Sequence, residues 1–132
     1  MAQQNSLDDL LVDEQGFNEG LLTDVLSPFV GIGDTSGALI PTDEFGELSS
    51  TAQTAVILLT RKAAHELGLS EEGGATPLEI SEISGINHNT VKTAVRKLDE
   101  MDLVDNEDGE YTVPTHNYDK AKVLILGDGD EC

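Results

Sequence analysis

The fold is decided by residues 76–114, which read TPLEISEISGINHNTVKTAVRKLDEMDLVDNEDGEYTVP. Thr76 and Glu79 have the spacing of a capping box, in which each side chain accepts a hydrogen bond from the backbone N–H group of the other residue. The proline directly after Thr76 suits the first position of a helix. Apolar residues follow at helical spacing as far as Gly85, which favours a helix end. The pattern therefore predicts a short helix that stops at this glycine.

A second helix is predicted directly after the glycine, over residues 87–101. Asn87 is a favourable N-cap residue, and Val91, Val95 and Leu98 recur at i, i+4 and i+7, which places them on one helical face. Two helices joined by a turn of about four residues with a central glycine form a helix-turn-helix.

The residues after this helix pair predict a small β-hairpin. Leu103 and Val104 are expected to form a short strand, residues 106–109 a turn and residues 111–113 the returning strand, which Pro114 ends. Such a hairpin, placed after a recognition helix, is the wing of a winged helix.

Upstream, residues 48–68 carry the longest helix signal in the chain. Ser49 or Ser50 can cap this helix, and Gly68 can end it. Residues 56–59 are four apolar side chains in a row, so the helix is expected to be buried on more than one side, either at the centre of the core or in an oligomer contact. With the helix pair and the hairpin, it completes the order of a winged helix-turn-helix.

Residues 76–114 resemble winged helix-turn-helix transcriptional regulators of archaea. The likeness lies in the TPLEIS opening, the SGINHNTVKTAVRKL turn and helix, the LDEMDLV strand start and the DGEYTV return. These regulators commonly have a glycine where Asp102 stands, so Asp102 is expected to take the left-handed conformation, which Asp tolerates better than most residues. The resemblance implies DNA binding, although winged helices also serve as protein-docking modules.

The flanking segments predict further elements around this core. Residues 19–28 predict a short amphipathic helix that Pro28 ends, and residues 29–41 predict a hairpin or an extended arm. A C-terminal helix, with Asn117 as a candidate cap, would expose an apolar face if left alone, so it is expected to pack against the N-terminal helix or to dimerise.

The expected fold class is α+β, with a winged helix-turn-helix core, an extra N-terminal helix and hairpin, and a C-terminal helix. The expected parts are an acidic N-terminal extension that packs on the core (1–48), a winged-helix domain (49–114), and a C-terminal helix with an acidic tail (115–132).

The chain is strongly acidic, with 26 Asp+Glu against 7 Lys+Arg and a formal net charge of −19. In molar salt the electrostatic screening length falls to about 3 Å, so neighbouring surface carboxylates no longer repel one another. This balance is typical of proteins that work in concentrated salt, and it indicates a halophilic archaeon, or its virus or plasmid, as the source. An acidic decoy that mimics DNA or binds a basic partner is the alternative interpretation.

The few basic residues are concentrated on the second helix of the pair. Residues 76–98 contain three basic and two acidic side chains and so carry +1; because the whole chain carries −19, the remaining residues carry −20. The candidate DNA-contacting residues are Asn87, His88, Asn89, Thr90, Lys92, Thr93, Arg96 and Lys97, with Arg61 and Lys62 on the long helix as a second candidate phosphate contact.

Different members of this set suit different parts of DNA. His88, Asn89 and Thr93 are suited to base edges, and Asn pairs well with adenine. The three cations of the helix are suited to phosphates: Lys92, Arg96 and Lys97. The alternative interpretation is that these are ordinary solvated residues on a helix that binds nothing.

The expected hairpin tip, NEDGE at residues 106–110, carries three carboxylates where many winged helices place Arg or Lys in the minor groove. DNA would repel such a tip, so recognition is expected from helix 87–101 alone. Low affinity for each module then favours a homodimer on two half-sites.

Other kinds of site are not indicated. The histidines are scattered without ligand spacing, the single Cys132 can form no internal disulfide, and the glycines of residues 31–37 lack the lysine and spacing of a phosphate loop. We expect no metal, no cofactor and no enzymatic activity. No apolar run is long enough to span a bilayer, so a cytoplasmic location without membrane contact is expected.

The sequence therefore predicts a sequence-specific DNA-binding transcriptional regulator that reads the major groove of double-stranded DNA with helix 87–101. The alternative is a winged-helix interaction module that docks a basic protein partner through its acidic surface. The sequence gives no signal for a small-molecule effector.

Overall fold

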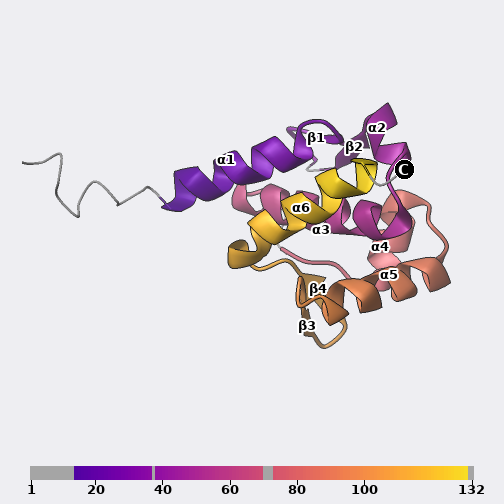
Figure 1. Cartoon of the computed structure of the whole chain (residues 1–132). Coiled ribbons are helices and arrows are strands. Elements are labelled where there is room, and N and C mark those ends of the chain that lie inside the picture. The colour runs from indigo at the N-terminus through magenta and orange to yellow at the C-terminus, as the bar shows by residue number, and fades with distance from the viewer. Residues whose placement is uncertain (1–13, 37, 70–72, 131–132) are drawn as a thin grey trace, which may run out of the picture.

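The computed structural model describes residues 14–36, 38–69 and 73–130, so residues 1–13 of the expected acidic extension and Cys132 lie outside the described residues. Within them the chain has the α+β class expected from the sequence (Figure 1). The helices are α1 (Glu14–Leu26), α2 (Asp43–Gly46), α3 (Ser50–Glu66), α4 (Pro77–Ser84), α5 (His88–Glu100) and α6 (Tyr118–Asp130). The strands form two antiparallel hairpins, β1 (Val30–Ile32) with β2 (Leu39–Pro41), and β3 (Asp105–Glu107) with β4 (Glu110–Thr112).

Helix α3 is the centre of the molecule, because α1, α4, α5, α6, β1 and β4 all pack against it. Its ends are as predicted: the Ser49 side chain accepts a hydrogen bond from the Ala52 N–H group at 3.2 Å, and Gly68 adopts a left-handed φ of 77° just beyond the helix. Buried Thr54 and Thr60 donate their hydroxyls to carbonyls one turn earlier, each at 2.8 Å, so neither leaves an unpaired polar group in the core. Of the two predicted roles, the core position is therefore observed.

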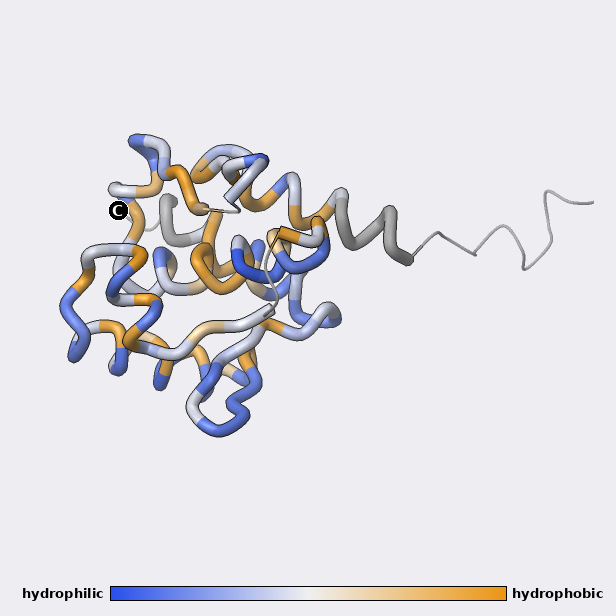
Figure 2. Tube along the Cα trace, turned by 180° about the vertical axis from the view of Figure 1, so that it is seen from behind, coloured by the Kyte–Doolittle hydropathy of each residue, from blue (hydrophilic) through white to orange (hydrophobic). Residues whose placement is uncertain are grey.

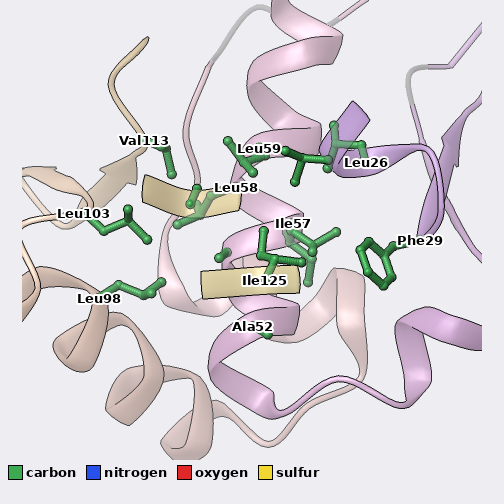
Figure 3. Close-up of a cluster of buried hydrophobic side chains, with 14 of the residues drawn as sticks. Leu26, Phe29, Ala52, Ile57, Leu58, Leu59, Leu98, Leu103, Val113 and Ile125 are labelled. Atoms are coloured by element: carbon green, nitrogen blue, oxygen red, sulfur yellow. The ribbon is translucent and has the colours of Figure 1, made fainter. Parts of the chain in front are cut away.

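Side chains from the rest of the chain converge on α3 (Figure 3). The buried side chains labelled there include Leu26, Phe29, Leu98, Leu103, Val113 and Ile125. They come from α1 and the turn after it, from α5 and the segment after it, from the residue after β4, and from α6. The flanking segments therefore share one hydrophobic core with residues 49–114.

The N-terminal part follows the prediction with an earlier start. Helix α1 begins at Glu14, before the predicted residue 19, and ends at Leu26, ahead of Pro28. The next segment is a hairpin, in which Val30 pairs with Pro41, so the alternative of an extended arm is wrong.

Helix α6 packs against α1 and α3, which confirms the predicted contact between the two terminal helices. Asn117, a candidate cap in the sequence, instead lies buried in a short 3₁₀ turn, and its side-chain amide donates to the carbonyls of Asp102 and Leu103 at 2.9 Å each. Lys120 donates to the carbonyl of Met101 at 3.3 Å. These side-chain hydrogen bonds thus hold the C-terminal segment against the backbone just beyond α5.

The predicted signals of residues 76–87 are confirmed in detail. The Thr76 hydroxyl accepts from the Glu79 N–H group at 3.2 Å, while the Glu79 carboxylate accepts from the Thr76 N–H group at 3.0 Å. Gly85 ends α4 with a φ of 78°, which glycine adopts without steric cost. Asp102 takes the expected left-handed conformation, with a φ of 59°.

The second hairpin is present as predicted, but its first strand begins two residues later and its returning strand, β4, begins one residue earlier than predicted. Leu103 and Val104 are buried in the core, and the first strand is β3, which begins at Asp105. Asp108 and Gly109 form the turn with φ values of 55° and 91°, the positive pair of a two-residue type I′ hairpin. The predicted position of the first strand was wrong because Leu103 and Val104, which were assigned to it, instead fill the core before β3 begins.

A further pairing, absent from the prediction, attaches this hairpin to the helices. Ala75 and Tyr111 exchange two backbone hydrogen bonds, at 2.9 and 2.8 Å. Gly74 makes the approach feasible, because a Cβ atom there would lie 2.5 Å from the Tyr111 carbonyl oxygen and from the Thr112 hydroxyl. The hairpin is therefore held beside the start of α4.

Candidate nucleic-acid interface

Helix α5 turns one face to the core and the opposite face to solvent. Val91, Val95 and Leu98 are at most 2% exposed, as predicted, and they face α3 and α4. The side-chain amide oxygen (Oδ1) of Asn87 accepts from the Asn89 N–H group at 2.8 Å and caps the helix. Because its inner face and its first turn are both fixed, α5 presents its outer face in a defined orientation.

The outer face of α5 carries all the residues of this helix and its N-cap that the sequence predicts to contact DNA. Asn89, Thr93 and Arg96 repeat at i, i+4 and i+7 on the side opposite the buried valines, with Lys92 beside them. The exposed members of the predicted set are Asn87, His88, Asn89, Thr90, Lys92, Thr93, Arg96 and Lys97. A single helix therefore displays both amide and cationic groups along one surface.

Within residues 14–36, 38–69 and 73–130, the cations of this face have no carboxylate partner. Among the described residues, the ion pair shorter than 4.0 Å is that of Arg61 with Glu79, and none involves Lys92, Arg96 or Lys97. Arg96 and Glu100 stand one turn apart, yet they do not approach within that distance. The three positive charges are thus available to an external anion.

The polar side chains differ in their remaining hydrogen-bonding capacity. The Asn87 oxygen is used by the cap, which leaves its NH₂ group, and the Thr93 hydroxyl donates back to the Asn89 carbonyl at 3.2 Å, which leaves its lone pairs. Within the described part of the chain, the side chains of His88 and Asn89 form no hydrogen bond. Asn89 therefore retains both a donor and an acceptor for a base edge.

Arg61 and Lys62 are placed differently from the α5 residues. The Arg61 side chain is 24% exposed, and its Nη2 atom lies 3.6 Å from a Glu79 carboxylate oxygen at the start of α4. Lys62 is half-buried beside the loop that carries Gly73. The ion pair of Arg61 is thus internal to the helix packing, a contact that no sequence signal indicated.

The β3–β4 hairpin presents acidic groups at its tip. Asp105, Glu107 and Asp108 are exposed, and Asn106 closes the turn by accepting from the Gly109 N–H group at 2.9 Å. Figure 2 shows the tip as a strongly hydrophilic loop that projects from the body of the molecule. Residues 101–114 contain no Lys or Arg, so the tip carries no compensating positive charge.

The described residues show no sign of a metal site or of a membrane-spanning helix. In residues 14–36, 38–69 and 73–130, no group of three or more His, Cys, Asp or Glu side chains is arranged to hold a metal ion. None of the described helices combines the length and apolar character needed to cross a bilayer. Comparisons with protein-family models, with curated proteins and with solved structures gave no match to this chain.

Proposed function

We propose that this chain is a winged helix-turn-helix protein that binds double-stranded DNA and regulates transcription, with α5 in the major groove. The order α3, α4, α5, β3 and β4 is compatible with that fold. Ala75, which pairs with Tyr111 of β4, would take the place of a third strand beside the hairpin. The observation that carries the proposal is the row of unpaired cations on the exposed face of α5, in a chain of net charge −19.

The physical reason is the scarcity of positive charge. A chain with 26 Asp+Glu and 7 Lys+Arg offers each cation many potential carboxylate partners. Lys92, Arg96 and Lys97 nevertheless point outward from α5 without one, which suits contact with the phosphates of a polyanion. Asn89, one turn before Thr93 on the same face, would read a base edge at the N-terminal end of α5, ahead of those phosphate contacts.

The acidic hairpin sets the binding mode. Glu107 and Asp108 at the tip would be repelled by phosphates, so we propose that α5 alone enters a groove and that the hairpin stays clear of the duplex. In the molar salt of a halophilic cytoplasm, counterion release adds little to affinity. A homodimer on two half-sites about 34 Å apart would recover affinity by engaging both recognition helices.

Charge reversal on α5 tests the proposal directly. Duplexes selected from a random-sequence pool would be labelled, and binding measured by fluorescence anisotropy in molar KCl. Lys92→Glu and Arg96→Glu are each expected to weaken binding roughly tenfold or more, because each replaces a phosphate contact by a repulsion. Lys122→Glu on α6 makes the same change in net charge away from α5, and it is expected to leave binding within about twofold.

The contrast between these variants separates the possible results. Equal weakening by all three substitutions would mean that only the net charge matters, and retained binding in Lys92→Glu and Arg96→Glu would remove α5 from the interface. Failure to select any duplex would reject the DNA-binding proposal itself.

The acidic hairpin favours a second candidate function. Glu107 and Asp108 are exposed at the two-residue turn and Asp105 is exposed at the start of β3, an anionic surface that suits a basic protein partner. This interaction module would bind its partner with Lys92 and Arg96 reversed, but it would lose the partner when Glu107 and Asp108 are changed to Lys. The two candidates therefore respond to different substitutions.

A further inference from the structure

An open cleft of about 480 Å³ lies between α3, α4 and the β1–β2 hairpin. Most of its described lining is apolar or carries a hydroxyl group, and Arg61 is the single charged residue in that lining. The lining includes Leu39, Ile57, Thr60, Arg61 and Ile83. A cation thus lies in a cleft lined by apolar and hydroxyl-bearing side chains, in a strongly acidic protein.

The guanidinium of Arg61 is incompletely partnered. Its Nη2 atom lies 3.6 Å from the Glu79 carboxylate oxygen, beyond hydrogen-bonding distance, and that same oxygen already accepts from the Thr76 N–H group at 3.0 Å. The Nε atom of Arg61 is buried and has no hydrogen-bond partner among the described residues. Because the Glu79 carboxylate is held by its hydrogen bond in the helix cap, it does not form a two-bond pair with the guanidinium.

The cleft also offers an apolar surface next to this cation. Ile83 of α4 is 42% exposed although it is a large hydrophobic residue, and Leu39 and Ile57 lie in the same lining. A planar guanidinium pairs best with a carboxylate, through two parallel hydrogen bonds. We propose that the cleft binds a small organic carboxylate, whose charge meets Arg61 and whose apolar body packs against Leu39 and Ile83.

Occupancy of the cleft would also act on α4. The Arg61–Glu79 pair joins α3 to α4, and α4 packs against α5. A ligand carboxylate would compete with Glu79 for the guanidinium and would press on Ile83, so it would change how α4 supports α5. This second step, a change in DNA affinity, rests on the proposed function, whereas ligand binding does not.

Benzoate is the probe for the binding step, because it combines a carboxylate with an apolar ring. Saturable binding to the full chain is expected by calorimetry in molar KCl, with NMR shifts confined to residues around Arg61 and Ile83. Benzamide, which has the ring without the charge, is expected to bind at least tenfold more weakly. Acetate, which has the charge without the ring, is also expected to bind more weakly than benzoate.

Two substitutions of Arg61 and one control complete the test. Arg61→Gln is expected to abolish benzoate binding, and Arg61→Lys, which preserves the charge and hence the packing around Glu79, is expected to weaken it. Lys122→Gln removes one positive charge from α6 and is expected to bind benzoate as the unmodified chain does. Unchanged binding in both Arg61 variants, or NMR shifts scattered over the surface, would overturn the proposed site.

The coupling step is measured separately. Saturating benzoate is expected to change the DNA affinity of the unmodified chain at least threefold and to leave that of Arg61→Gln unchanged. Benzoate binding without any effect on DNA affinity would overturn the coupling and leave the site in place. A chain that binds benzoate at Arg61 but no duplex would reject the proposed function and not the site.

Discussion

Asn89 and Lys92 lie side by side on the outer face of α5, but they suit different parts of a duplex. The amide of Asn89 has a donor and an acceptor free, the arrangement that recognises adenine in the major groove. The ammonium group of Lys92 is a point charge with no carboxylate partner in the part of the chain that the structure describes, and it suits any phosphate. The two side chains should therefore differ in how their removal affects specificity and salt dependence.

That difference can be measured with two neutral substitutions. Lys92→Gln is expected to reduce the slope of log K against log salt by about one and to weaken all duplexes alike. Asn89→Ala is expected to leave the slope unchanged and to relax the preference at one base pair, at a cost of about 1–3 kcal/mol for the preferred base. Binding isotherms over a series of KCl concentrations, with single-base variants of the selected duplex, would show both effects. A change of slope in Asn89→Ala would contradict the assignment of this residue to a base.

At the scale of elements, the attachment of the β3–β4 hairpin depends on one glycine. Gly74→Ala would place a Cβ atom 2.5 Å from the Tyr111 carbonyl oxygen, so the Ala75–Tyr111 pairing must shift or break. The expected loss of unfolding free energy is about 1–3 kcal/mol, the usual cost of overpacking. Gly73→Ala is a matched control, because its nearest neighbour would be His65 at 3.6 Å, an ordinary contact. Chemical denaturation in molar KCl would compare the two, and equal stability would contradict the role of Gly74.

The elements that the sequence predicted well are those with local chemical signals. The capping box at Thr76, the left-handed glycine at Gly85 and the cap at Ser49 are all defined by neighbouring residues, so a single stretch of sequence contains the information. The buried spacing of α5 is local in the same way, and the outward position of its polar residues follows from it.

The features that were missed depend on distant parts of the chain. Ala75 and Tyr111 are remote in sequence, and no local pattern pairs them. Arg61 has the same exposed helical character as any surface cation, and its turn towards Glu79 follows from the packing of α3 on α4. Leu103 has the local pattern of a strand residue, but in the structure it is buried in the core that α3 and α6 help to form.

At the scale of the whole molecule, the acidic surface ties stability to salt. A net charge of −19 on a chain of 132 residues creates repulsion that is strong in dilute buffer and screened within about 3 Å in molar salt. The unfolding temperature is therefore expected to rise as KCl increases from dilute to molar, when followed by circular dichroism. An unfolding temperature that is independent of KCl would contradict adaptation to concentrated salt.

The proposed homodimer makes a geometric prediction about its operator. Two α5 helices that reach successive major grooves need half-sites about 34 Å apart, on the same side of the duplex. Insertion of half a helical turn, about five base pairs, would move one half-site to the opposite side and is expected to weaken binding roughly tenfold or more. Anisotropy with the two spacings would measure this, and light scattering of the complex would give two chains per duplex. Indifference to the spacer would mean that each chain binds alone.

The two hydrogen bonds from the Asn117 side chain to the backbone beyond α5 limit how the chain can be divided into smaller folded units. Residues 49–114 are the predicted winged-helix domain, and they are the obvious segment to excise and transplant into a chimeric protein. That cut would strip the donor from two backbone oxygens, at Asp102 and Leu103, and would open the flank of α3 that Ile125 now covers. A portable unit must therefore include the final helix, and, because Leu26 and Phe29 lie in the same core, the N-terminal helix as well.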